Sequence, residues 1–167
     1  MDFIELVQAT KKEHAHKRIL SFDPGHTTGW CCFEGGALIG CGQIDTTSIT
    51  NCLENAQALY HTYHPEIVVM EDYRIYKWRA KHHVGSEVLT VQIIGCLETL
   101  AIQDFVNHVI KQPAHVAKGF CDDKKLKEWK FWVSGERHAR DAIRHACYYI
   151  LFGAVRPEDK HKGRSVG

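Results

Sequence analysis

The sequence predicts an α/β fold with a mixed five-stranded sheet flanked by helices. Three observations support this class: strand-like segments come first and form a hairpin meander, helical and strand-like segments then alternate, and the chain closes on a long helix with a repeating apolar face. Such an order places antiparallel and parallel neighbours in one sheet. With 167 residues, the chain is long enough for one domain with its own core.

The N-terminal half is expected to contain an extension, a meander and a helix. Apolar runs bounded by turn residues indicate strands, and Gly35-Gly36 is a two-residue hairpin signal. Apolar residues then recur at helical spacing, with Thr50 or Asn51 as N-cap, until Pro65 ends the helix. The predicted segments are an N-terminal extension at 1–17 with a short amphipathic helix, strands at 18–22, 28–34 and 37–44, and a helix from 51 up to Pro65.

The C-terminal half is predicted to alternate strands and helices. The run "EIVVMED" at 66–72 is too short for a helix and is continuously apolar, as in a strand buried on both faces. The further segments are a helix at 86–101 opened by Gly85-Ser86, a strand at about 105–111 and a helix at 136–152. We therefore expect one domain over 18–155, followed by a flexible tail at 156–167.

The composition predicts a soluble, cytoplasmic protein. Lys plus Arg number 21 and Asp plus Glu number 20, so net charge neither requires nor excludes a nucleic-acid partner. The seven cysteines lie mostly in apolar segments without a C-x-x-C pair, which favours reduced thiols over disulfides or structural zinc. The N-terminus lacks the pattern of a signal peptide, and no segment reaches the roughly 18 apolar residues of a membrane span.

Two of the apolar strand runs end on a carboxylate. Asp23 ends "RILSFD" and Glu71 follows "IVVM", although the adjacent Asp72 is an alternative for the inward-facing acid. If these strands are parallel neighbours, the two carboxylates lie side by side at the sheet edge where ligands bind in such folds. Their mutual repulsion would raise at least one pKa unless a cation is bound.

The last predicted helix adds a third acid. The stretch "HARDAIRHA" places His138 and Asp141 at i and i+3, and therefore on one helix face. A site of three carboxylates and one histidine favours Mg²⁺ or Mn²⁺. Two such ions would support in-line displacement at a phosphate, one activating water and one stabilising the leaving oxygen.

The stretches "FDPGHTTGW", the acid after "IVVM" and "HARDAIRHA" together resemble the RuvC family of Holliday junction resolvases, within the ribonuclease H-like nucleases, in the style of bacterial and bacteriophage members. The similarity covers about 18–152. It implies that Asp23, Glu71 and Asp141 are metal-binding catalytic acids, and that His138 is a metal ligand, a proton carrier or a neighbour. It also implies a homodimer that makes paired symmetric nicks in branched DNA inside a bacterial or phage-infected cell.

A basic and aromatic segment follows Glu71 directly. Aromatic faces stack on unpaired bases while Arg and Lys contact phosphates, so this segment is expected to bind DNA, with one aromatic as a wedge. Its predicted DNA-binding residues are Tyr73, Arg74, Tyr76, Lys77, Trp78, Arg79 and Lys81. The resemblance adds Lys118 as a contact near the cleaved phosphate. A second basic cluster at 124–132 is interpreted as an exposed helix face with some phosphate contact.

Three other functions remain open at this point. The same chemistry could act on flaps, replication forks or RNA/DNA hybrids, because substrate choice depends on loop shape and dimer geometry. A branched-DNA-binding module without activity would not need Asp23, Glu71 and Asp141. An actin-like ATPase also has a D-x-G-x-T-like turn after its first strand, but its two-domain architecture needs a far longer chain.

Overall fold

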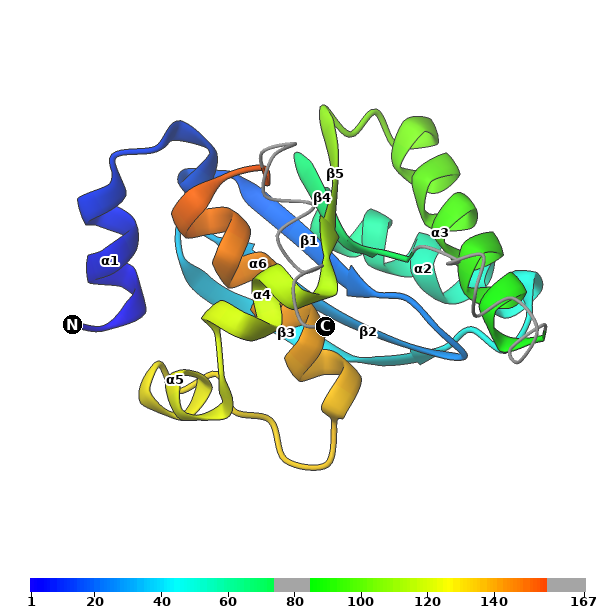
Figure 1. The fold of residues 1–167 in the computed structure, drawn as a ribbon. Helices are drawn as coiled ribbons and strands as arrows, with labels where there is room; N and C mark the ends of the chain where they lie inside the picture. Colours follow the sequence, from blue (N-terminus) through cyan, green and yellow to red (C-terminus); the bar gives the residue numbers. More distant parts are fainter. Residues whose placement is uncertain (74–84, 156–167) are drawn as a thin grey trace.

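A computed structural model describes residues 1–73 and 85–155, and it confirms the α/β class with one mixed sheet (Figure 1). The five strands lie in the order β3-β2-β1-β4-β5. The meander β1 to β3 is antiparallel, whereas β4 lies parallel to both β1 and β5. The strands are β1 (Arg18–Asp23), β2 (Thr27–Glu34), β3 (Ala37–Asp45), β4 (Ile67–Asp72) and β5 (His108–Pro113).

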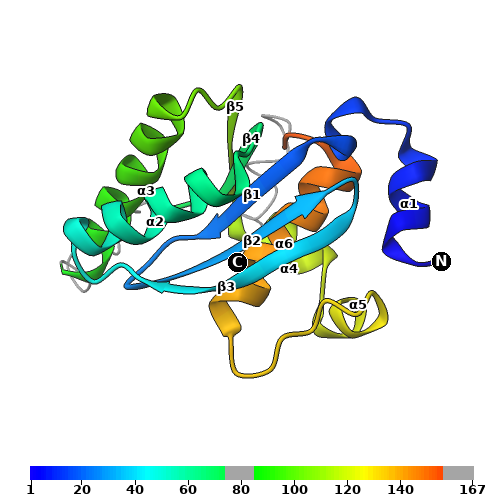
Figure 2. The same ribbon diagram turned by 180° about the vertical axis from the view of Figure 1, so that it is seen from behind.

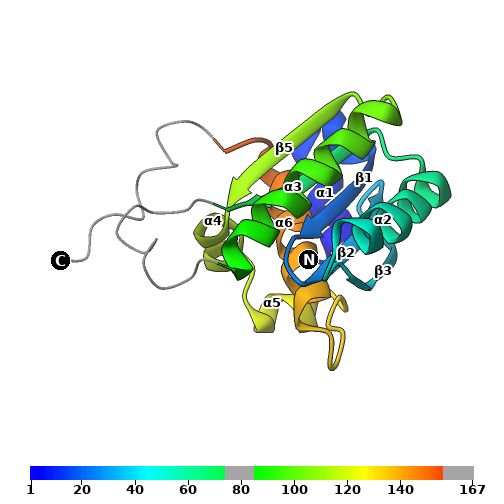
Figure 3. The same ribbon diagram turned by 90° about the vertical axis from the view of Figure 1, so that its right-hand side faces the viewer.

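Helices cover both faces of the sheet, as Figures 1 and 2 show from opposite sides. Side chains alternate along a strand, so Ile19 of β1 packs toward one layer and Leu20 toward the other. One face carries α6 (Arg137–Phe152), with α1 (Phe3–Thr10) packed into the same core. The other carries α2 (Ile49–Tyr63) and α3 (Ser86–Gln103), which lie side by side (Figure 3). No helix in the described ranges is long and apolar enough to cross a membrane.

The N-terminal extension packs into the core on the α6 face. Asp2 caps α1, and Phe3, which is almost fully buried, contacts the rings of Phe33, Trp129 and Phe131. A short 3-10 turn, η1 (Glu13–His16), then brings His14 Nε2 to 2.9 Å from the carbonyl oxygen of Tyr149, near the end of α6. The extension therefore adds apolar core and hydrogen-bonds the last turn of α6.

The structure corrects the predicted start of the last strand. Phe105 was expected to begin it, but β5 begins at His108. Phe105 lies instead in the turn after α3, with φ of 56° and 90% of its surface exposed. Its backbone N–H donates to the carbonyl oxygen of Ile102, so the local turn determines its conformation.

The charged segment between β5 and α6 forms two short helices, α4 (Ala114–Phe120) and α5 (Asp123–Glu128). Asp122 caps α5 by accepting from the Lys125 N–H. Leu126 of α5 and Trp129, which follows the helix, are buried in the core on the α6 face. One side of α5 therefore packs on the domain. Because α4 follows β5 without a loop, its residues lie beside the carboxyl ends of the parallel strands.

Candidate active site

Asp23 and Glu71 end two neighbouring parallel strands, as the sequence predicted. Phe22 of β1 pairs with Met70 of β4, so the two acids come next in the same register. Strand alternation puts both on the face covered by α6, and it puts Asp72 on the opposite face. Glu71 is therefore the inward-facing acid. Asp23 is 7% exposed, which makes it a nearly buried carboxylate.

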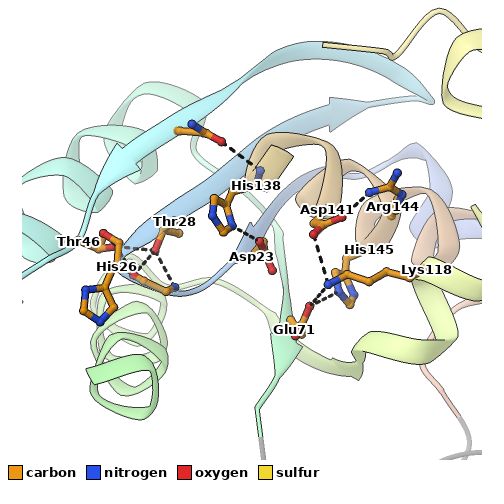
Figure 4. A network of polar contacts seen from close by, with 12 residues as sticks. Asp23, His26, Thr28, Thr46, Glu71, Lys118, His138, Asp141, Arg144 and His145 are labelled. Carbon is orange, nitrogen blue, oxygen red and sulfur yellow. Dashed lines mark hydrogen bonds and ion pairs between the residues drawn. The ribbon is translucent and has the colours of Figure 1, made fainter. Parts of the chain in front are cut away.

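Helix α6 adds Asp141 and His138 to this edge, as predicted (Figure 4). His138 Nδ1 lies 2.8 Å from Asp23 Oδ2, which joins the start of the helix to the end of β1. Asp141, one turn further along, is 5% exposed. Residues far apart in the chain thus meet at the carboxyl ends of β1 and β4. We call the three acids there, Asp23, Glu71 and Asp141, the acidic edge.

Three contacts determine where α6 crosses the sheet. Gly29 on β2 has no side chain, and a Cβ there would lie 1.9 Å from the His138 carbonyl oxygen. Gln43 on β3 accepts a hydrogen bond from the His138 backbone N–H at 3.0 Å, near the helix N-terminus. The buried Ser21 hydroxyl donates to the Ala142 carbonyl oxygen at 2.9 Å. Together they hold α6 close to β1 and β2.

Lys118 on α4 lies among the acids. Its Nζ is 3.2 Å from Glu71 Oε2 and 3.3 Å from Asp141 Oδ2 (Figure 4). An ammonium group in this position offsets the repulsion between the two carboxylates. The Lys118 phosphate contact stays a prediction, and the structure places the Lys118 ammonium group beside Glu71 and Asp141.

Two residues of the site were not anticipated from the sequence, Arg144 and His145. Arg144 donates to Asp141 and also to Asp123 at the start of α5, which ties that helix to the acidic edge. His145 is fully buried, and its Nε2 lies 3.2 Å from Glu71 Oε2. A usable signal existed in "HARDAIRHA", because positions three and four residues after Asp141 share its side of the helix.

The charges of the site depend on burial and on these partners. Burial raises the pKa of Asp23, and the nearby Glu71 and Asp141 charges add to this, although the hydrogen bond from His138 opposes it. Burial also acts to raise the pKa of Glu71, but His145 and Lys118 together lower it to about 2. Although burial opposes it, the surrounding acids raise the pKa of Lys118.

The turn after Asp23 is held by two buried threonines. Thr28 and Thr46 share a hydrogen bond of 2.7 Å, and the Thr46 hydroxyl also donates to the carbonyl oxygens of Gly25 and His26. His26 itself is exposed (Figure 4). These residues shape the turn that leads the chain away from Asp23.

Most of the predicted DNA-binding segment lies outside the described residues: Arg74, Tyr76, Lys77, Trp78, Arg79 and Lys81. Tyr73 is described, and it is partly buried against the core on the α2–α3 face. In the second basic cluster, Lys127 lies over the Trp132 ring, 4.6 Å from its centroid, and Arg140 of α6 lies over the same ring at 4.4 Å. That cluster therefore pairs cations with a partly exposed aromatic surface.

The acidic edge has the donor chemistry of a divalent-cation site. Its three carboxylates supply the hard oxygen ligands that Mg²⁺ and Mn²⁺ prefer. Within the described residues, however, no three His, Cys, Asp or Glu side chains are gathered around one point. The Lys118 ammonium group lies between Glu71 and Asp141. The oxygen ligands of these carboxylates thus fit the predicted ions. In this structure the Glu71 and Asp141 side chains contact the Lys118 ammonium group.

Comparison with known proteins places this arrangement in a familiar fold. No family model and no curated protein matched the chain. Among solved structures, Thermus thermophilus RuvC in complex with a Holliday junction substrate aligns with a TM-score of 0.67 at 14% identity, over 82% of this chain and 94% of that chain. The yeast mitochondrial Holliday junction resolvase Ydc2 aligns at 0.54 and 11% identity, over 89% and 83%. The fowlpox virus Holliday junction resolvase aligns at 0.51 and 16%, over 80% and 97%.

The sheet order and its helical layers thus define an α/β fold of the ribonuclease H-like kind. Within that class, the fold is the one shared by RuvC and other Holliday junction resolvases. The resemblance found in the sequence motifs is confirmed at the level of the fold. Because the matched resolvases include bacterial, yeast mitochondrial and viral proteins, the bacterial or phage type stays a prediction.

Proposed function

We propose that this protein is a metal-dependent endonuclease that resolves four-way junctions or related branched DNA by paired symmetric nicks. The observation that carries the proposal is the convergence of Asp23, Glu71 and Asp141 with Lys118 at one sheet edge. Two buried carboxylates, Asp23 and Asp141, beside the partly buried Glu71 are costly unless they act on a cation or a substrate. The resolvase fold favours branched DNA as that substrate.

The residues divide the work according to their charges. Asp23, Glu71 and Asp141 would hold Mg²⁺ or Mn²⁺, two ions in one site, and such ions polarise a phosphate and lower the pKa of water when bound. Lys118 places a positive charge beside the acids, where it can pair with a phosphate oxygen. His138 keeps Nδ1 on Asp23, which leaves Nε2 of this partly exposed side chain as the nitrogen that can exchange a proton.

Paired nicks require two sites related by a two-fold axis, so the proposal includes a homodimer. Helix α3 offers one surface for it, because Val88 and Val91 are 46% and 43% exposed near its N-terminal end. A dimer through α3 would place two acidic edges on one junction.

The test is cleavage of a labelled four-way junction in Mg²⁺ by the wild type and by Asp23→Asn. Matched linear duplex, flap and RNA/DNA hybrid substrates identify the preferred nucleic acid. Paired nicks that are lost in Asp23→Asn, while junction binding survives, would support the proposal. Preferred cleavage of flaps or hybrids would replace the substrate, and tight junction binding without cleavage in Mg²⁺ or Mn²⁺ would indicate a non-catalytic binding module.

A further inference from the structure

A buried histidine behind the acidic edge has no role in the scheme above. His145 lies on α6 one turn after Asp141, and it is fully inaccessible to solvent. Its described side-chain contact is with Glu71 rather than Asp23, and the imidazole lies beside the Glu71 carboxylate (Figure 4). We propose that His145 is a positioning residue that orients the Glu71 carboxylate through Nε2. This inference rests on the proposed metal-dependent function.

The contacts around His145 join three elements at one point. Glu71 on β4 is in register with Gln112 on β5, so the two are direct neighbours across the sheet. The His145 side chain contacts Glu71 at 3.2 Å, and its carbonyl oxygen accepts from Gln112 Nε2 at 3.3 Å. Gln112 is also fully buried. A shift of α6 relative to β4 would therefore disturb both contacts.

The hydrogen-bonding capacity of the groups determines the state of the imidazole. An ionised carboxylate only accepts hydrogen bonds, so Nε2 must carry the proton that points to Glu71. His145 Nδ1 has no hydrogen-bond partner among the described residues. The imidazole thus makes its one described hydrogen bond to Glu71, whereas a leucine would fill a buried apolar site without leaving a polar atom unpaired.

The same contacts select one oxygen of Glu71. Both His145 and Lys118 approach Oε2, at 3.2 Å each. Among the described contacts none involves Oε1, so this oxygen is available to a metal ion. Because His145 cannot leave the core, it keeps this orientation even when Lys118 moves to a phosphate. Such outer partners of carboxylate ligands typically alter metal affinity by 10- to 100-fold.

The first experiment is independent of catalysis and of metal. Nitrogen-15 NMR of the metal-free protein reports which imidazole nitrogen of His145 carries the proton. We expect the Nε2–H form, with a slowly exchanging proton whose resonance shifts in Glu71→Gln. An Nδ1–H form, or a resonance that ignores Glu71→Gln, would overturn the assignment.

The second experiment compares His145→Leu with His145→Gln, whose amide nitrogen reaches about as far as Nε2. Mn²⁺ binding measured by calorimetry should weaken roughly 10- to 100-fold in His145→Leu and much less in His145→Gln. The Mn²⁺ concentration for half-maximal junction cleavage should move in the same order, with junction binding unchanged. Equal Mn²⁺ affinity in the wild type and a folded His145→Leu would contradict the positioning role.

A control variant and the Mn²⁺ binding of the wild type distinguish failure of the proposed nuclease function from failure of the His145 proposal. His14→Leu removes a histidine that contacts the other end of α6, so it should lower stability without changing Mn²⁺ affinity. If the wild type binds Mn²⁺ but cuts no branched DNA, the proposed function fails while the His145 comparison still stands. If the wild type binds no Mn²⁺, the metal site fails and the NMR result alone decides the role of His145.

Discussion

Gly29 and His138 approach so closely that a Cβ on Gly29 would lie 1.9 Å from the carbonyl oxygen of His138. This contact lets α6 descend onto β2, so that His138 reaches Asp23 and Asp141 reaches the same edge. The geometry of the acidic edge therefore depends on a missing side chain on a neighbouring strand.

Replacing Gly29 by alanine should displace α6 and weaken the fold. Overpacking of this kind costs about 1–3 kcal/mol, and here the obstacle is backbone that cannot rotate away. Urea unfolding measures the loss. The matched control is Gly95→Ala on the exposed face of α3, where nothing lies within 4 Å of an added Cβ. That change should stabilise by roughly 0.5–1 kcal/mol, and an equal loss in both variants would contradict the close-approach argument.

Replacing Phe3 by alanine tests whether the N-terminal extension belongs to the core. Phe3 is almost fully buried against Trp129 and Phe131, so we expect a loss of about 3–5 kcal/mol. Ile4, its neighbour on α1, is 44% exposed, and Ile4→Ala should stay within about 0.5 kcal/mol. Thermal or urea unfolding distinguishes the two. A small effect of Phe3→Ala would mean that α1 packs only loosely on the domain.

Replacing Lys118 by methionine should raise the pKa of Glu71 from about 2 toward its ordinary value of 4.5. Because the Lys118 side chain is 38% exposed, the expected destabilisation at neutral pH is about 1–2 kcal/mol rather than that of a fully buried pair. The depressed pKa of Glu71 stabilises the fold above about pH 4.5, and this contribution is lost as pH falls toward 2. The gap between wild type and variant should therefore close in acid.

Urea unfolding at several pH values measures this gap. Lys111→Met is the control, since Lys111 pairs with Glu98 at the surface, 2.7 Å apart. It should cost at most about 1 kcal/mol. A gap for Lys118→Met that stays constant between neutral pH and pH 2 would show that Lys118 does not control the ionisation of Glu71.

The contact between His138 and Asp23 predicts that the His138 imidazole loses its proton at a higher pH than an ordinary histidine. The hydrogen bond that His138 donates to Asp23 raises the pKa of His138 above its ordinary value of 6.5. The contribution of the pair to stability is present below that value and is lost as pH rises through the pKa of the folded protein. Proton NMR titration of metal-free protein measures it. In Asp23→Asn the His138 pKa should fall, and an unchanged titration would contradict the contact.

Local patterns in the sequence were sufficient for most of the fold. Glycine, proline and the period of apolar residues bound the segments that became β1 to β4, α2, α3 and α6. The predicted start of the last strand at Phe105 was wrong, because an apolar residue beside a strand resembles part of it. Its backbone is instead in the left-handed conformation of a turn. Helices α4 and α5 were obscured by their charges, since their amphipathic faces span only a turn or two.

The site residues can likewise be separated into those that the sequence predicted and those that only the tertiary structure revealed. Strand ends and helix spacing were enough to select Asp23, Glu71 or Asp72, His138 and Asp141 as candidates, because those positions follow from local periodicity. Tertiary structure alone decided that Glu71 rather than Asp72 faces α6, that Lys118 lies between two acids, and that His145 supports Glu71 from the core. These contacts join α4, β4 and α6, and their distances depend on how closely the helices pack on the sheet, which no local pattern encodes.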